Sequence, residues 1–211
     1  MNLKNKIIGI FLGLIIILPL PVLSADPQKL NMVFVPASEK GDNQDYESLI
    51  EIIERLADIQ IKPIRVTDYN AAVESMRAGR AHIAWYGGKT YIQAAEMAGA
   101  EAFAAGVRKG DDTAGYYAYF VVPVDSPLNA LEDVRGQILG LNSIGSTSGD
   151  LIPQVELMKI GLSTKNENDF AKVFYAGSHD ACLLAAINKH VDVCGMSSRN
   201  FDARLADGTF K

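Results

Sequence analysis

The chain has 211 residues with a formal net charge of −5, and 48% of its residues are hydrophobic. Such a chain can bury a substantial core in one or two domains, and nothing in its composition indicates disorder. The negative charge argues against nucleic-acid binding, which needs clustered Lys and Arg. A bound anion would be held by local hydrogen bonds and not by the overall field of the protein.

Residues 1–25 have the pattern of a secretory signal peptide. Two lysines precede an apolar run at residues 7–18, and the small residues Ser24 and Ala25 stand at the expected cleavage point. The run is shorter than a membrane span of about 20 residues. We therefore expect export to the periplasm after cleavage, with an uncleaved anchor as the alternative.

From residue 29 onward, strand patterns alternate with helix patterns. Pro63 places the second strand at or near a sheet edge, and Asp68 is placed to cap the second helix. The alternation predicts a parallel sheet covered by helices. The predicted strands are residues 29–35, 61–66, 82–86 and 102–107, and the predicted helices are residues 44–58, 69–78 and 89–98.

A long β-rich run at residues 115–124 breaks this alternation, and turn residues follow it at 125–127. A second α/β series then predicts helices at 128–133, 151–162, 179–189 and from about 199, with strands at 138–142, 171–175 and 191–196. We predict two lobes, residues 26–121 and 122–211. A cleft between them would bind a ligand beyond the carboxyl ends of the strands.

Residues 145–150 (GSTSGD), between a predicted strand and a predicted helix, are the chain's main candidate site. Hydroxyls, free backbone N–H groups and the positive end of a helix suit an oxyanion, although an ordinary helix cap is the alternative. Thr147 stands where a nucleophile elbow needs Ser, and no Gly-Lys-Ser/Thr follows. Gly88-Lys89-Thr90 has that ending, but Ile83 replaces the first glycine of a phosphate-binding loop. We predict no catalytic residues, no enzyme activity and no cofactor.

Several further segments combine with this one. They are Asp68-Tyr69, Ile83-Ala84-Trp85-Tyr86-Gly87, Gly115-Tyr116-Tyr117, Asp125-Ser126-Pro127, Ser146-Thr147-Ser148-Gly149 with Pro153, and Gly177-Ser178-His179-Asp180. In order and spacing they resemble the phosphonate/phosphite/phosphate-binding proteins of ABC importers, from about Lys29 to Phe201. The resemblance implies an α/β fold of the two-lobed, type II periplasmic binding protein kind, each lobe a mainly parallel sheet flanked by helices, which closes on its ligand by hinge motion.

The resemblance also implies a set of ligand-binding residues: Tyr69, Tyr116, Ser146, Thr147, Ser148, His179 and Arg199. The loop hydroxyls and amides would bind the phosphorus oxygens, the imidazole would add a hydrogen bond, and the phenols would close over the group from the first lobe. Arg199 stands where aminoalkylphosphonate binders carry a carboxylate. It would repel a ligand ammonium and favour an acidic or uncharged tail, phosphite or phosphate. The alternatives are packing tyrosines, a capping histidine and a solvent-facing arginine.

The remaining residues of note have structural alternatives. His82 and His190 have no partners at metal-ligand spacing, so we predict structural roles and no metal site. Trp85 and Tyr86 are expected to pack near the cleft mouth. Cys182 and Cys194 are either a disulfide of an exported protein or two buried thiols.

The expected function is the periplasmic substrate-binding component of an ABC transporter, a monomer that delivers a phosphorus oxyanion to a permease in the inner membrane. A ligand-sensing or accessory module for a membrane signalling partner is the alternative. Members of the family continue past the position of Lys211 and return to the first lobe, so the chain is expected to be short at its C-terminal side.

Overall fold

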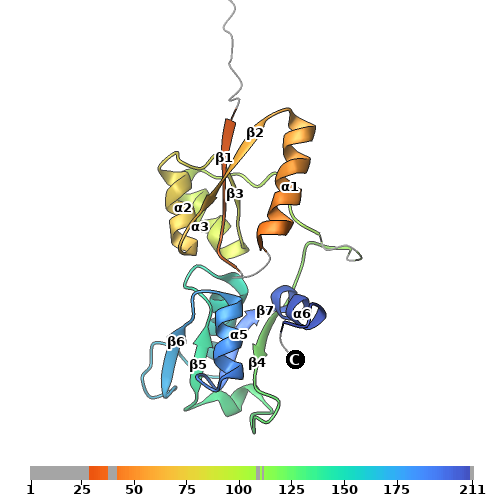
Figure 1. Cartoon of the computed structure of the whole chain (residues 1–211). Coiled ribbons are helices and arrows are strands. Elements are labelled where there is room, and N and C mark those ends of the chain that lie inside the picture. The colour runs from red at the N-terminus through yellow and green to blue at the C-terminus, as the bar shows by residue number, and fades with distance from the viewer. Residues whose placement is uncertain (1–28, 38–41, 108–109, 111, 210–211) are drawn as a thin grey trace, which may run out of the picture.

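The computed structural model of the protein describes residues 29–37, 42–107, 110 and 112–209. The predicted signal peptide lies outside these residues. The described chain forms two α/β lobes, each with its own sheet (Figure 1). Among the helices of this part, none has the length and apolar character needed to cross a membrane.

The first lobe is built on a three-stranded parallel sheet of order β2-β1-β3. Its elements are β1 (Lys29–Phe34), α1 (Asp42–Ala57), β2 (Gln60–Arg65), α2 (Tyr69–Arg77), β3 (Ile83–Trp85) and α3 (Gly88–Ala98). Side chains of β1 alternate between two cores, as the period of a strand requires. Met32 and Phe34 pack with α1, whereas Val33 packs with α2. Figure 1 shows α1 on one side of the strands and α2 with α3 on the other.

Two predicted details of this lobe are confirmed. Pro63 lies in β2, which is an edge strand, where a residue without an N–H is tolerated. The Asp68 carboxylate accepts a hydrogen bond of 2.9 Å from the Ala71 amide and caps α2.

The second lobe has a four-stranded sheet of order β4-β7-β5-β6, in which only β4 is antiparallel to its neighbour. Its strands are β4 (Ala118–Val121), β5 (Ile138–Leu141), β6 (Lys172–Tyr175) and β7 (Val193–Ser197). Its helices are α4 (Ile152–Lys159), α5 (His179–Ile187) and α6 (Ser198–Ala206), with a 3-10 turn η1 (Leu131–Val134) and a π-helical turn η2 (Thr147–Leu151). Leu139, Leu141, Leu157 and Val193 form the centre of its core.

Two predicted elements are wrong. Residues 102–107 are irregular, because small residues fill most of the run and its large side chain Phe103 is exposed, leaving no apolar face to pack. The helix predicted at 128–133 is only the turn η1.

The β-rich run at residues 115–124 forms a strand only at β4. This strand pairs with β7, with Val121 opposite Cys194, and so belongs to the sheet of the second lobe. The boundary expected after Val121 had assigned it to the first. Aromatic and β-branched residues indicate that a strand forms, but they do not identify its partner.

Cys182 and Cys194 form a disulfide, which settles the alternative that the sequence left open. Both residues are fully buried, and the bond joins α5 to β7. Gly140 of β5 lies against it, since a Cβ there would come within 3.1 Å of the Cys182 sulfur. The disulfide therefore fixes the start of α5 on the sheet, three residues from His179.

Candidate binding cleft

The predicted ligand residues all line one cleft between the lobes, with a volume of about 400 Å³. The residues that meet there are Tyr69, Tyr116, Ser146, Thr147, Ser148, His179 and Arg199. They come from helices and loops of both lobes and from segments more than a hundred residues apart in the sequence. The structure thus brings together side chains that the sequence associates only through motifs.

The loop before α4 is held in shape by its own first hydroxyl. Ser146 is extended, and its Oγ accepts a hydrogen bond of 3.0 Å from the Gly149 amide. A Cβ on Gly149 would lie 2.4 Å from the Cβ of Asn142, so only glycine fits there. Ser146 and Ser148 are both buried. The loop therefore presents its polar groups to the cleft and not to bulk solvent.

Thr147 lies at the contact between the lobes. Its Oγ1 accepts a hydrogen bond of 2.9 Å from the Lys89 amide in the first turn of α3. A Cβ on Gly87 would stand 3.1 Å from the same oxygen. The glycine lets the first lobe approach the loop closely, and Thr147 is oriented by a backbone group of the opposite lobe.

His179 begins α5 and is only 3% exposed. Its Nδ1 accepts a hydrogen bond of 3.3 Å from the Ser197 amide at the end of β7. Burial lowers the pKa of His179 to about 4, so the imidazole is neutral at pH 7. With Nδ1 as the acceptor, the ring hydrogen is on Nε2, and the side chain can donate one hydrogen bond.

Asn142 connects the two lobes through residues that line the cleft, and no sequence motif had identified it. It is fully buried at the end of β5, and its Nδ2 lies 3.4 Å from both the Tyr69 hydroxyl and the Ser146 hydroxyl. Its backbone is fixed by bonds to Gly149 and Gly177. The available signal was a polar residue closing an apolar strand directly before a hydroxyl-rich loop.

Arg199 braces the segment that crosses between the lobes. Its Nη2 donates to the carbonyl oxygens of Gly106, Ala114 and Gly115 at 3.3, 3.0 and 3.4 Å. The guanidinium also stacks over the Tyr116 ring, 5.3 Å from its centroid. Arg199 therefore positions Tyr116 at the cleft and brings a positive charge to its wall, which excludes the solvent-facing alternative.

The rest of the cleft wall consists of aromatic and small side chains. Its other lining residues include Trp85, Tyr86, Tyr91, Ala102, Ala104 and Ala105. Tyr86 donates to the Ala72 carbonyl at 3.1 Å, and burial raises its pKa to about 12. Trp85 packs against Gly106, where a Cβ would come within 2.6 Å of the ring. Among the described residues, the cleft is lined by no carboxylate.

His82 lies outside the cleft and has a structural contact. The Nδ1 of His82 accepts a hydrogen bond of 2.9 Å from the Asn31 amide. Within the described ranges, no group of His, Cys, Asp and Glu is arranged to hold a metal ion.

A polar contact beside the cleft joins α3 to the loop of the second lobe. Lys89 Nζ lies 2.6 Å from the buried carboxylate of Asp150 and also donates to the Ile144 carbonyl. Thr90 donates to the Gly145 carbonyl at 2.8 Å. The Gly88-Lys89-Thr90 segment, which is no nucleotide loop, thus has a role in holding the lobes together.

Asp150 is held on its other side by its own lobe. Gln154 donates to it at 2.6 Å and the Tyr175 hydroxyl at 2.9 Å. Burial and the Asp150 charge raise the pKa of Tyr175, which keeps that hydroxyl a donor. The carboxylate therefore connects η2, α4 and β6 to Lys89 of the first lobe.

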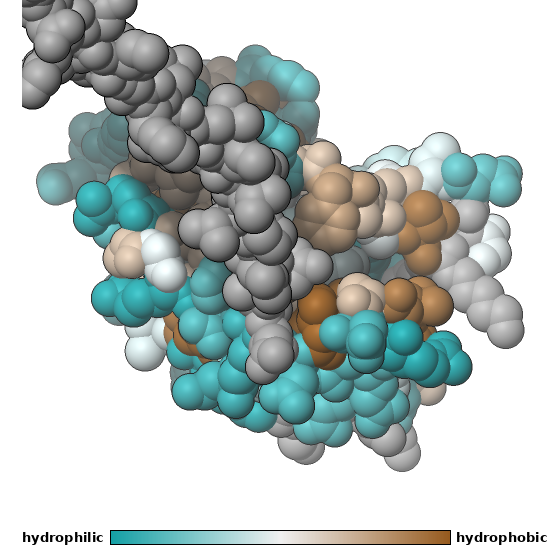
Figure 2. Space-filling model, turned by 90° about the horizontal axis from the view of Figure 1, so that it is seen from above, coloured by the Kyte–Doolittle hydropathy of each residue, from teal (hydrophilic) through white to brown (hydrophobic). Residues whose placement is uncertain are grey.

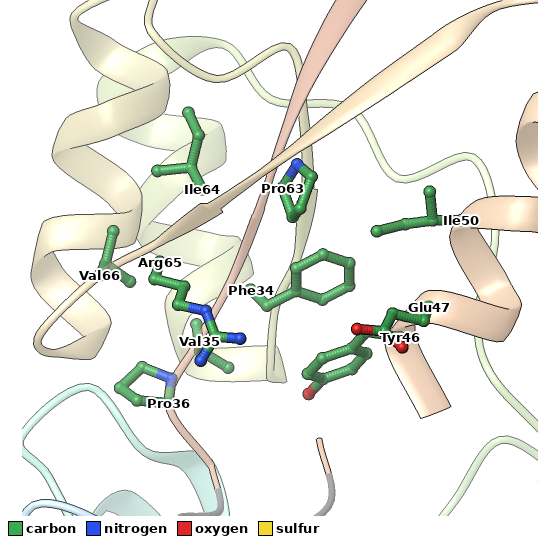
Figure 3. A pocket seen from close by; sticks show the side chains of 10 residues that line it. All are labelled: Phe34, Val35, Pro36, Tyr46, Glu47, Ile50, Pro63, Ile64, Arg65 and Val66. Atoms are coloured by element: carbon green, nitrogen blue, oxygen red, sulfur yellow. The ribbon is translucent and has the colours of Figure 1, made fainter. Parts of the chain in front are cut away.

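A smaller hollow of about 180 Å³ lies on the first lobe between α1, β1 and β2 (Figure 3). Most of its lining is apolar, and the rings of Phe34 and Tyr46 stack 4.0 Å apart within it. Glu47 and Arg65 are the charged side chains in Figure 3. None of the predicted ligand residues lines this hollow, so the cleft between the lobes is the better candidate.

Large exposed hydrophobic side chains occur at separate places, such as Leu56 on α1 and Leu184 on α5. The face in Figure 2 shows brown hydrophobic areas interrupted by teal hydrophilic ones.

Comparison with known families places this geometry in context. Residues 32–210 match the family described as "ABC transporter, phosphonate, periplasmic substrate-binding protein". The chain is similar to the phosphonates-binding periplasmic protein of Escherichia coli K12, with 28% identity over 169 residues, covering 78% of this chain and 49% of that protein. It is also similar to the phosphate-import protein PhnD of Mycolicibacterium smegmatis, with 29% identity over 174 residues. The match covers 79% of this chain and 54% of that protein. The chain spans about half the length of these curated relatives.

Solved structures show the same architecture. A binding protein component of an ABC phosphonate transporter from Pseudomonas aeruginosa superposes with a TM-score of 0.75 and 25% identity, covering 85% of this chain and 60% of that chain. PhnD1 of Prochlorococcus marinus in complex with methylphosphonate superposes with a TM-score of 0.72 and 23% identity, covering 87% of this chain and 69% of that chain. These likenesses confirm the predicted two-lobed α/β fold.

Proposed function

The chain belongs to the phosphonate-binding family of periplasmic substrate-binding proteins of ABC transporters, and we propose that it captures a phosphonate, phosphite or phosphate in the cleft between its lobes. One observation carries the proposal: hydroxyls, an imidazole and phenols from both lobes line a single cleft. The captured oxyanion would be delivered to an ABC permease. The proposed location is the periplasm, reached through the signal peptide.

The cleft chemistry suits a tetrahedral oxyanion. Ser146, Thr147 and Ser148 offer hydroxyl donors, and neutral His179 offers the hydrogen on Nε2. Hydrogen bonds to a charged group contribute roughly 1.5–3 kcal/mol each, so a handful supports sub-micromolar binding after association costs. This free energy comes from local donors, in keeping with a chain whose net charge is −5.

The charge on the cleft wall sets a preference for the chemical group that the ligand carries beside its phosphorus oxygens. Arg199 places a positive charge there, and no carboxylate among the described residues lines the cleft to neutralise an ammonium. We therefore expect phosphite and methylphosphonate to bind at least about tenfold more tightly than 2-aminoethylphosphonate, which corresponds to about 1.4 kcal/mol.

No chemical step is proposed for the bound ligand. The relatives carry the names of binding and import proteins. A capture role needs only donors, a hinge and two stable lobes.

A thermal-unfolding series tests the proposal. The protein would be heated with phosphite, methylphosphonate, 2-aminoethylphosphonate or phosphate, because a ligand that binds only the folded state raises the melting temperature. We expect phosphite, methylphosphonate or both to raise the melting temperature clearly. No rise with any of the four would contradict the proposed function. Thr147→Val, which keeps the side-chain volume and removes the hydroxyl, should reduce the rise.

A further inference from the structure

Acceptor positions of three cleft side chains are occupied by backbone amides. The Gly149 amide donates to Ser146 Oγ at 3.0 Å, and the Lys89 amide donates to Thr147 Oγ1 at 2.9 Å. The Ser197 amide donates to His179 Nδ1 at 3.3 Å. These amides come from the loop itself, from α3 and from β7. Separate parts of the fold therefore all use acceptor positions of these side chains and leave their hydrogens for a ligand.

An oxygen or nitrogen that already accepts a hydrogen bond directs its own hydrogen elsewhere. Ser146 Oγ accepts from both the Gly149 amide and Asn142 Nδ2, which uses both of its lone pairs. His179 has a single ring acceptor, and the Ser197 amide uses it. Thr147 Oγ1 has one of its two acceptor positions filled by the opposite lobe. Ser146 and His179 therefore face the cleft only as donors, and Thr147 keeps a single acceptor position.

We propose that the cleft is donor-only at Ser146 and His179 and thereby selects the fully deprotonated form of its oxyanion, with Asn142 as a positioning residue. The inference rests on the proposed function. A ligand oxygen that keeps its proton needs an acceptor, and around these side chains its hydrogen would meet another hydrogen. A fully ionised phosphonate or phosphite offers only acceptors and matches each donor.

Asn142 holds the Ser146 and Tyr69 oxygens in this arrangement. Its Nδ2 donates to both, and its side chain is fully buried. Its N–H donates to the Gly149 carbonyl at 2.9 Å, and its carbonyl accepts from the Gly177 amide at 2.7 Å. The amide side chain is therefore anchored to the loop that it orients.

Other charged and titratable groups surround the site and require a control. Those lining the cleft among the described residues are His179, Arg199, Tyr69, Tyr86, Tyr91 and Tyr116. Behind them, Lys89 pairs with Asp150, and Asp180, next to His179, pairs with Arg204. A change in affinity with pH must therefore be assigned to the ligand or to the protein.

Calorimetry with two ligands makes this assignment. Methylphosphonate and chloromethylphosphonate are similar in size, but the electron-withdrawing chlorine lowers the second pKa of the latter. Titrations between pH 5 and 8, in buffers of different ionisation enthalpy, give both the affinity and the number of protons released. We expect the affinity to fall about tenfold per pH unit below each ligand's own second pKa. About one proton should be released per ligand bound in that range.

The titrations distinguish a failure of the donor-only inference from a failure of the proposed function. Binding at low pH without proton release, or a fall at the same pH for both ligands, would overturn the donor-only inference and leave the proposed function standing. Binding of neither ligand at any pH would overturn both.

The role of Asn142 has its own test. Asn142→Asp replaces the donor by an acceptor, so the Ser146 hydroxyl can turn its hydrogen to the new carboxylate and offer a lone pair to a protonated ligand oxygen. Proton release on binding methylphosphonate should then fall well below that of the unchanged protein. A variant that is folded by thermal unfolding, yet releases the same number of protons, would contradict the role assigned to Asn142.

Discussion

At the scale of single residues, Thr147 is a cleft hydroxyl that is oriented by contact between the lobes. Thr147→Val removes the hydroxyl that accepts from the Lys89 amide and leaves the shape nearly unchanged. We expect the affinity for a phosphorus oxyanion to fall about tenfold or more, because the ligand loses a donor and the Lys89 amide loses its acceptor. Calorimetry measures the change. Thr147→Ser keeps the hydroxyl and should retain most of the affinity; equal losses in both variants would show that the hydroxyl is not what matters.

His179 predicts a pH dependence of stability in the absence of ligand. Burial lowers its pKa from 6.5 to about 4. The unfolded chain therefore takes up a proton near pH 6.5, whereas the folded chain resists it until about pH 4. The contribution of neutral His179 to the free energy of unfolding is therefore fully present above pH 6.5 and is lost as the pH falls toward 4. The difference corresponds to about 3 kcal/mol.

Denaturant unfolding of His179→Asn checks this. The amide oxygen can still accept from the Ser197 amide, but the side chain does not titrate. The free energy of unfolding of the variant should fall less steeply between pH 6.5 and 4 than that of the unchanged protein. Parallel pH profiles for the two proteins would contradict the role of burial.

The sequence was informative about residues that carry a motif and silent about those that support them. Ser146, Thr147 and His179 stand in recognisable segments, and the structure places them on one cleft. Asn142 and Lys89 act through long-range contacts, with Tyr69 and Asp150 as partners. No local pattern encodes such pairs, because they exist only once the two sheets have formed and met.

At the scale of elements, α3 and η2 form a joint between the lobes. Lys89→Met keeps the length of the side chain but removes the charge that pairs with Asp150 across the joint. We expect faster ligand dissociation and an affinity lowered about tenfold, because the pair stabilises the arrangement in which the cleft is complete. Stopped-flow dissociation measures the rate.

Lys159→Met is the matched control for this prediction. Lys159 pairs with Glu156 at 2.7 Å on the exposed face of α4, within a single helix. Exposed pairs of this kind contribute little. Equal effects of the Lys89 and Lys159 variants on the dissociation rate would contradict the role of the joint.

The disulfide between α5 and β7 predicts a stability effect that reaches the site. It closes a short loop of sequence separation 12, and loss of such a bond costs about 2–4 kcal/mol. The double variant Cys182→Ala, Cys194→Ala should lower the melting temperature. It should also weaken ligand binding, since His179 starts the helix that the bond holds. Calorimetric unfolding and a ligand titration check the two effects, and an unchanged melting temperature would contradict the first.

Element prediction from the sequence succeeded where apolar periodicity was strong, as in β1, α5 and β7. It failed at residues 102–107 and 128–133, where small residues and turn residues left the periodicity weak. It also extended the run around β4 too far and gave it to the wrong sheet. A strand's extent depends on its partner, and β7 lies more than seventy residues away in the sequence.

At the scale of the whole molecule, two lobes with separate cores enclose a site that neither lobe completes. Hydroxyls and the imidazole come from the second lobe, and Tyr69 from the first. The proposed capture of an oxyanion therefore requires both lobes in contact, and the bonds of Lys89 and Thr90 hold them together.

The most direct test is an isothermal titration of the protein with phosphite and methylphosphonate, repeated with a variant in which Ser146→Ala, Thr147→Val and His179→Asn are combined. We predict saturable binding of one ligand per chain with a dissociation constant of about 1 μM or below, and its loss in the combined variant. Absence of binding to the unchanged protein, or equal affinity in a folded combined variant, would contradict the assignment of the cleft.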